Sequence, residues 1–161
     1  IIRNECSLTK DNIVYDLYCG TGSISIFIAN QVKAVYGFEL ISQAIENAEK
    51  NLLRNQVKNV QFFCGDLKNL LKKNSDIQSI PKPNTVILDP PRAGMHKNTV
   101  RDVIQLSPDT IVYCSCNPST QARDIKIFCD AGYFLKKIQP IDMFPHTPHI
   151  ECVSTLIKFY E

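Results

Sequence analysis

A cysteine in the C-terminal third of the chain has the surroundings of a nucleophile. Cys116 precedes Asn117 and Pro118, a pair typical of a helix start, with asparagine as the cap and proline in the first turn. Because a helix N-terminus favours thiolate over thiol, we interpret Cys116 as a nucleophile. Cys114 is expected to lie inside a strand as a small hydrophobe. The alternative is that both are unreactive core cysteines.

A carboxylate further along the chain is the candidate base. Glu151 precedes an apolar run and ends the segment 144–151, which contains two prolines and two histidines. We interpret the histidines as groups that hold this loop by hydrogen bonds, and we expect no metal site. Glu151 is either a solvated strand end or, if it faces a ligand, a general base.

A glycine turn followed by a distant acid points to a nucleotide-like ligand. Gly20 and Gly22 would let the backbone approach a ligand at a helix N-terminus. Glu39 comes about 20 residues on, the spacing at which an acid meets ribose hydroxyls. A dinucleotide-binding turn would need a third glycine where Ser25 stands, so a tight turn with a solvated acid is the alternative.

Asp89 and Arg92 frame a pair of prolines. The prolines end the preceding apolar run and stiffen the chain beyond it. Asp89 is then a fixed hydrogen-bond acceptor with the Arg92 cation close behind, and both could hold a substrate. The alternative is a rigid turn whose acid caps the next segment.

The elements that position these residues are predicted by strand and helix patterns that alternate along the chain. Ser42 is expected to cap a long amphipathic helix. Strands are expected at residues 13–17, 34–38, 60–64, 84–88, 110–114, 133–138 and 153–159, and helices at 23–30, from 42, at 98–106 and from 117 to about 130. This alternation predicts one α/β domain with an open, mainly parallel seven-stranded sheet and helices on both faces.

The chemistry is expected to converge on one edge of that sheet, because ligands bind beyond the carboxyl ends of parallel strands. The link before the last strand is too short for a parallel crossover, so this strand should run antiparallel and start at the same edge. Residues 74–83 form the one insertion that reads as a loop. The residues brought together at the edge would be Gly20, Gly22, Glu39, Asp66, Asp89, Cys116 and Glu151.

Composition limits the partners and the setting. Apolar residues make up 44% of the 161 positions, and the net charge is only +2, so a core is available but no broad basic surface for nucleic acid. Seven cysteines without a Cys-x-x-Cys pair argue against zinc or iron–sulfur sites and for a reducing, cytoplasmic setting. No apolar run is long enough for a transmembrane helix.

Four motifs, in this order, resemble the RNA (uracil-5-)methyltransferases that form 5-methyluridine in tRNA and 23S rRNA. They are residues 16–22, 89–92, 115–118 and 142–151, and the resemblance covers nearly the whole chain. It implies the class I, Rossmann-like fold of methyltransferases that use S-adenosyl-L-methionine. The implied cofactor contacts are Tyr18, the turn of Gly20 and Gly22, Ser23, Glu39 on the ribose, Asp66 on the adenine side, and Asp89.

The resemblance also implies a role for each catalytic candidate. Cys116 would add to C6 of a uracil and make C5 able to attack the methyl sulfonium, and Glu151 would then remove the C5 proton. Asp89 and Arg92 would hold the substrate. That substrate would be an RNA, either tRNA or rRNA, with a flipped or looped uridine.

The sequence departs from the family pattern in places, and other functions stay open. Ser23 stands where family members often have asparagine, and neither an N-terminal RNA-binding region nor a glutamine-bearing cofactor segment is present. We therefore expect a monomeric fragment that binds cofactor weakly and methylates RNA poorly alone. The alternatives are a base-nitrogen methyltransferase, a cytosine-5 methyltransferase and a non-catalytic nucleotide- or RNA-binding module.

Overall fold

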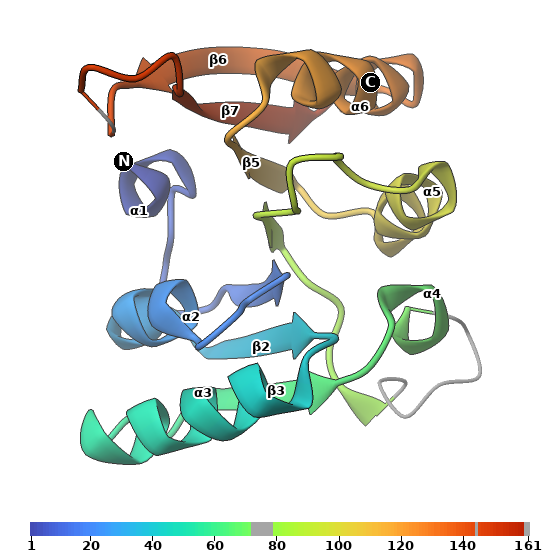
Figure 1. Cartoon of the computed structure of the whole chain (residues 1–161). Coiled ribbons are helices and arrows are strands. Elements are labelled where there is room, and N and C mark those ends of the chain that lie inside the picture. Colours follow the sequence, from blue (N-terminus) through green and yellow to red (C-terminus); the bar gives the residue numbers. More distant parts are fainter. Residues whose placement is uncertain (72–78, 144, 160–161) are drawn as a thin grey trace.

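Seven strands form one sheet in the computed structural model of the chain, which describes residues 1–71, 79–143 and 145–159 (Figure 1). The order across the sheet is β3-β2-β1-β4-β5-β7-β6. All seven expected strands are confirmed: β1 (Ile13–Leu17), β2 (Ala34–Glu39), β3 (Val60–Cys64), β4 (Thr85–Leu88), β5 (Thr110–Ser115), β6 (Tyr133–Ile141) and β7 (Glu151–Lys158).

The direction of the strands follows from the connections between them. The pairs β1–β2, β1–β4, β2–β3 and β4–β5 are parallel. In contrast, β7 pairs antiparallel with both β5 and β6. The link of nine residues between β6 and β7 is too short for a crossover. The predicted reversal of the last strand is therefore confirmed.

Helices cover both faces of the sheet, with α1, α2 and α3 on one side and α4, α5 and α6 on the other (Figure 1). Val14 and Ala48 belong to the core cluster on the first side, and Tyr15 and Phe128 to the cluster on the second. Because both faces are buried, the central strands are apolar along most of their length, with Asp16 of β1 as an exception. The helices are α1 (Ile2–Glu5), α2 (Ser23–Ile28), the 3₁₀ turn η1 (Ala29–Gln31), α3 (Ser42–Arg54), α4 (Leu67–Leu70), α5 (Lys97–Leu106) and α6 (Pro118–Asp130).

The start of α3 differs from the expectation. Ser42 is the first residue of the helix, Ile41 takes the N-cap place, and no side chain caps from there. Instead, Oε1 of Glu39 accepts hydrogen bonds from the backbone N–H groups of Leu40 (2.7 Å) and Ile41 (3.0 Å). The prediction that Ser42 caps this helix is wrong, because an acid at the end of β2 already satisfies the free amides before it.

Short elements account for the other differences. The helix expected at residues 23–30 ends as a 3₁₀ turn, and the four-residue helices α1 and α4 were not predicted because one turn carries no periodic pattern. Residues 74–78 of the loop expected at 74–83 lie outside the described residues, and residues 80–83 belong to no helix or strand. In the part of the chain that the structure describes, no helix combines the length and apolarity needed to cross a membrane.

Candidate active site

The carboxyl ends of the central strands meet at one edge of the sheet. The parallel register pairs Leu17 of β1 with Phe38 of β2 and with Leu88 of β4. The next residues continue this alignment: the N–H of Tyr18 donates to the carbonyl of Phe38 (2.9 Å), and the N–H of Asp89 to that of Leu17 (3.3 Å). The side chains that follow these strands therefore start from the same level.

The glycine turn after β1 is fixed by Glu39. The N–H of Gly20 donates to Oε2 of this carboxylate at 3.1 Å. Gly20 and Gly22 have φ of +53° and +77°, a left-handed conformation that favours glycine. A Cβ on Gly22 would lie 2.5 Å from a ring carbon of Phe62, whereas a Cβ on Gly20 would meet no atom within 4 Å. Packing therefore requires Gly22, and the space beside Gly20 is open to a ligand.

A small pocket of about 120 Å³ lies at the ends of β1, β2 and β3. It brings together three of the predicted cofactor contacts, Tyr18, Glu39 and Asp66. Asp66 also caps α4, since its Oδ1 accepts a hydrogen bond from the N–H of Lys68 at 2.9 Å. His96 and Thr99 complete the wall from the side of α5.

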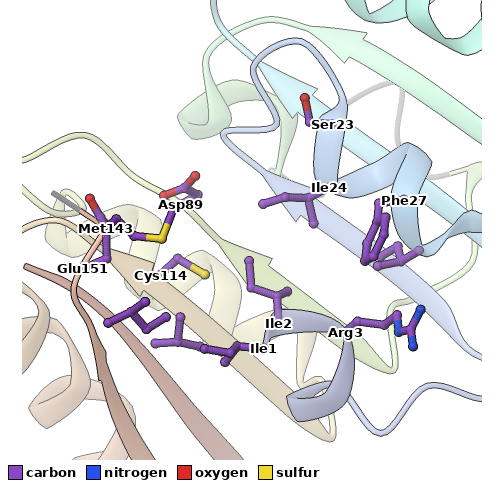
Figure 2. Close-up of a pocket in the computed structure, with 13 residues that line it drawn as sticks. Ile1, Ile2, Arg3, Ser23, Ile24, Phe27, Asp89, Cys114, Met143 and Glu151 are labelled. Carbon is purple, nitrogen blue, oxygen red and sulfur yellow. The ribbon is translucent and has the colours of Figure 1, made fainter. Parts of the chain in front are cut away.

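A larger pocket of about 550 Å³ opens beyond the ends of β4, β5 and β7. Figure 2 shows Asp89, Glu151 and Cys114 gathered on one side of it and Ser23 on the other. Three predicted site residues, Ser23, Asp89 and Glu151, thus share this pocket. The rest of the lining is mainly apolar and includes Ile1, Ile2, Ile24, Phe27 and Met143.

Two carboxylates influence each other in the larger pocket. Asp89 stays accessible at the mouth, but the surrounding protein removes part of its hydration. This desolvation is the main cause that raises the pKa of Asp89, and the negative charge of Glu151 raises it further. The two acids are thus close enough to compete for negative charge, and a proton or hydrogen-bond donor between them would be favoured.

Cys116 and Glu151 lie at the same end of the β5–β7 ladder, each one residue beyond its last pair. The last pair of this antiparallel ladder is Ser115 and Cys152, so Cys116 follows one partner and Glu151 precedes the other. Continuing the register by one step sets these two residues opposite each other. In a regular ladder, opposed residues have Cβ atoms about 5 Å apart. The thiol and the carboxylate therefore belong to the same end of the sheet.

The turn that carries Cys116 is held from both sides. Oγ of Ser115 accepts a hydrogen bond from the N–H of Asn117 (3.0 Å) and donates to its carbonyl (3.1 Å). Oδ1 of Asn117 accepts from the N–H of Ser119 (3.1 Å), which confirms the predicted cap of α6. Cys116 is half-buried. Cys114 is buried, and this burial raises the pKa of its thiol well above the ordinary range, so it stays protonated.

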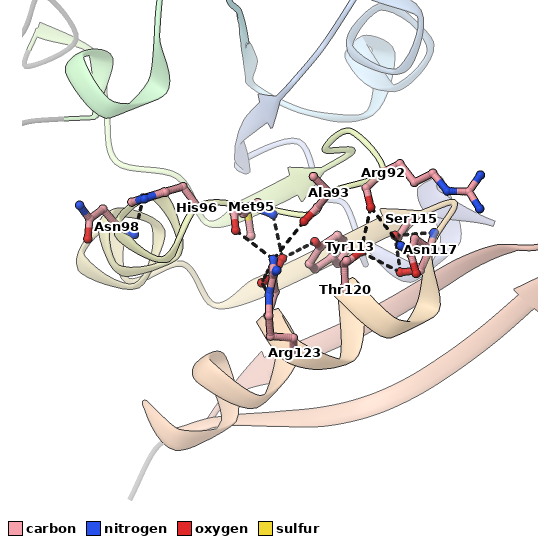
Figure 3. A network of polar contacts seen from close by, with 11 residues as sticks. Arg92, Ala93, Met95, His96, Asn98, Tyr113, Ser115, Asn117, Thr120 and Arg123 are labelled. Carbon is pink, nitrogen blue, oxygen red and sulfur yellow. Dashed lines mark hydrogen bonds and ion pairs between the residues drawn. The ribbon is translucent and has the colours of Figure 1, made fainter.

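The structure does not bring every predicted residue into one cavity. Of the described residues, those that line the two pockets include neither Cys116 nor Arg92. Arg92 lies in the loop after Pro91, and its exposed side chain points away from the neighbouring polar contacts (Figure 3). Both residues therefore lie outside the walls of the two pockets.

Comparison with known proteins decides the family. A family model described as tRNA (Uracil-5-)-methyltransferase matches residues 3–159. The chain belongs to this family. An uncharacterized RNA methyltransferase of Porphyromonas gingivalis is 46% identical over 159 residues, which are 98% of this chain and 34% of that protein. The chain thus spans about a third of the length of the curated relatives it matches.

Solved structures agree with this family and with its fold. The chain is similar to a Pyrococcus abyssi tRNA (uracil-54, C5)-methyltransferase solved with S-adenosyl-L-homocysteine, with a TM-score of 0.80 and 36% identity over 97% of this chain and 37% of that one. A precorrin-6y C5,15-methyltransferase of Geobacter metallireducens shares the fold at a TM-score of 0.78 and 16% identity, covering 98% of this chain and 86% of that one. The expected class I methyltransferase fold is confirmed.

One buried acid near the site was not predicted as a site residue. Asp16 lies inside β1, fully buried, with Oδ2 accepting a hydrogen bond from Oγ of Ser25 at 2.6 Å. Its Oδ1 has no hydrogen-bond partner among the described residues. The signal in the sequence was an acid within the otherwise apolar run 13–17, because an acid in such a strand is buried only at a cost.

Proposed function

We propose that this chain is the catalytic domain of an S-adenosylmethionine-dependent methyltransferase that acts on C5 of a uridine in RNA. The observation that carries the proposal is the register of β5 and β7, whose last pair, Ser115 with Cys152, leaves Cys116 and Glu151 as the next residues at the same end of the sheet. Membership of the uracil-5 family supports the target atom. It disfavours a base nitrogen or a cytosine as the target, and also a non-catalytic module.

The residues around the glycine turn fit the cofactor. Glu39 and Asp66 offer carboxylates to ribose and adenine in the small pocket, where Tyr18 adds a ring. The open space at Gly20 lets the ligand pass close to the backbone. Ser23, just after the turn, lines the larger pocket. When bound there, S-adenosylmethionine supplies an electrophilic methyl group on a sulfonium.

Cys116 and Glu151 supply the two groups that C5 methylation needs. The thiolate adds to C6 of the uracil, so that a C6–S bond forms and the electron pair of the C5–C6 double bond makes C5 nucleophilic. After C5 has taken up the methyl group, the carboxylate of Glu151 removes the C5 proton. The C5–C6 double bond re-forms, the C6–S bond breaks, and the thiolate leaves.

Asp89 and Arg92 are proposed to hold the uridine. The raised pKa of Asp89 next to Glu151 favours a hydrogen bond from the ring N–H of uracil, which would stabilise the carboxylate. Arg92 follows on the exposed loop, where a guanidinium can meet a phosphate. Because both faces of the ring must be reached, the uridine has to be unstacked from its RNA.

The net charge of +2 favours local contacts to this RNA over a broad electrostatic surface. We propose tRNA or rRNA in the cytoplasm as the substrate.

Nucleoside analysis of cellular RNA tests this function. Cells without the gene should lack 5-methyluridine in one tRNA or rRNA species, and the wild-type gene should restore it. Cys116→Ala should fail to restore it although the variant still binds cofactor. Cys129→Ala, which changes an exposed cysteine of α6, is the matched control and should restore it. Restoration by Cys116→Ala would contradict the proposal.

A further inference from the structure

An ion pair on the helix after Cys116, with its carboxylate buried, is hydrogen-bonded to the loop after Asp89. Asp124 of α6 is 1% exposed, and its Oδ1 pairs with Nη2 of Arg123 at 2.8 Å and accepts from Nε at 2.9 Å. Its Oδ2 accepts from the hydroxyl of Tyr113 and from the backbone N–H of Met95, both at 2.8 Å. A buried carboxylate with this many donors is held in one place.

Side chains of α6 and of its cap residue also donate hydrogen bonds to backbone carbonyls of the loop (Figure 3). Nη2 of Arg123 donates to the carbonyls of Ala93 (3.2 Å) and Met95 (3.1 Å). The carbonyl of Arg92 accepts from Nδ2 of Asn117 (3.1 Å) and from the hydroxyl of Thr120 (3.2 Å). The loop at residues 92–95 belongs to no helix or strand, so α6 supplies much of its polar contact.

The loop approaches the helix closely at Gly94. Gly94 adopts φ of +73°, and a Cβ on it would lie 2.6 Å from Nη2 of Arg123 and 2.8 Å from Oδ2 of Asp124. The side chain of Met95 is buried in the core next to this contact. Backbone, ion pair and core packing therefore specify one position for the loop.

We propose that Arg123 and Asp124 are positioning residues that set the loop of Arg92 against Cys116. The loop follows Asp89 and the two prolines, and α6 follows Cys116 and the cap residue Asn117. The hydrogen bonds of Arg123 and Asp124 to the loop therefore connect the groups that would bind uracil to the group that would attack it. Neither residue touches substrate. This inference rests on the proposed function, and it adds how the substrate loop and the nucleophile are kept in register.

Arg123→Lys separates positioning from folding. A lysine keeps the positive charge beside buried Asp124, but its single ammonium cannot reproduce the planar fork that binds the carboxylate and two loop carbonyls together. The Arg123 side chain is 47% exposed, so the change creates no cavity in the core. The matched control is Asp130→Asn, which removes an exposed pair with Lys126 on the same helix and should have little effect.

Two measurements are needed, amide hydrogen exchange and covalent trapping, and both use the full-length protein. Amide hydrogen exchange should become faster at residues 92–95 in Arg123→Lys and stay unchanged in the control. With saturating cofactor and a 5-fluorouridine transcript of the RNA that nucleoside analysis identifies, covalent trapping by Cys116 should slow roughly tenfold to a hundredfold, as expected for a small misplacement of reacting groups. Cofactor affinity and the unfolding midpoint should remain close to those of the wild type.

The outcomes are distinguishable. Trapping by Arg123→Lys at the wild-type rate would overturn the inference, and so would slower trapping that merely parallels lost cofactor binding or lost stability. If the wild type forms no adduct, or Cys116→Ala still forms one, the proposed function itself fails. In that case the exchange rates at residues 92–95 still decide whether Arg123 holds the loop.

Discussion

Asp16 is the residue whose surroundings are least suited to its charge. It is fully buried in β1, and this burial raises its pKa to about 7. The hydrogen bond from Ser25 opposes the shift, and the negative charge of Asp89 adds to it. Asp16 lies one residue before the end of β1 and contacts Ser25 of α2, so we predict that the stability of the fold depends on its protonation.

Asp16→Asn tests this through stability. Since the folded-state pKa lies above the ordinary value of 3.8, the folded protein binds a proton that the unfolded chain lacks between those two values. The free energy of unfolding should therefore fall as pH rises from about 4 to 7, by up to about 1.4 kcal/mol per pH unit from this group. Asparagine removes that dependence.

Urea denaturation of wild type and Asp16→Asn at pH 5 and pH 8 is the measurement. Relative to the wild type, the variant should be more stable at pH 8 than at pH 5. If the difference in the free energy of unfolding between the two proteins is the same at pH 5 and pH 8, Asp16 titrates at an ordinary value.

At the scale of elements, the two glycines of the turn between β1 and α2 have different roles. Gly22 is required by packing, and Gly20 leaves space for a ligand. Gly22→Ala places a Cβ at left-handed φ and against the ring of Phe62, so it should destabilise the fold by at least the roughly 1–2 kcal/mol of the backbone strain. Gly20→Ala carries similar strain but meets no atom within 4 Å. It should be the milder change for stability and the more damaging one for cofactor affinity.

Thermal unfolding and cofactor titration of the two glycine variants check this prediction. The order of the two effects matters more than their size. If Gly20→Ala binds cofactor as well as Gly22→Ala does, the ligand does not pass beside Gly20.

The elements also show how far sequence patterns reach. All seven strands and the cap of α6 by Asn117 were predictable, because burial on both faces and capping chemistry leave local signals. The start of α3 was not, since Ser42 is already inside the helix and the carboxylate of Glu39 binds the two backbone amides just before it. The ion pair of Arg123 and Asp124 was also missed, because its partners come from a loop about 30 residues away.

At the scale of the whole molecule, the strand order explains why two pockets lie at one edge of the sheet. The chain turns from β1 toward β2 and β3 on one side and toward β4 and β5 on the other, and ligands bind at such a switch point. Tyr18 lines the pocket on the first side and Asp89 the pocket on the second. A ligand with two unlike ends can therefore lie across the end of β1.

The insertion of β7 between β5 and β6 completes the site from the other direction. Because β7 runs antiparallel, it starts at the ligand edge and brings Glu151 to the level of Cys116. The sequence predicted this reversal from the short link alone, but the register needed the pairing of Ser115 with Cys152. That the chain alone binds cofactor weakly and methylates poorly stays a prediction.

Trapping of the reaction between addition and elimination tests the pairing of thiol and carboxylate most directly. Glu151→Gln, incubated with S-adenosylmethionine and an unmodified transcript of the RNA that nucleoside analysis identifies, should accumulate an RNA–protein complex that survives denaturation. Mass spectrometry of its peptides should place a methylated uracil on Cys116. A complex linked through another cysteine, or a Glu151→Gln protein that turns over like the wild type, would contradict the account.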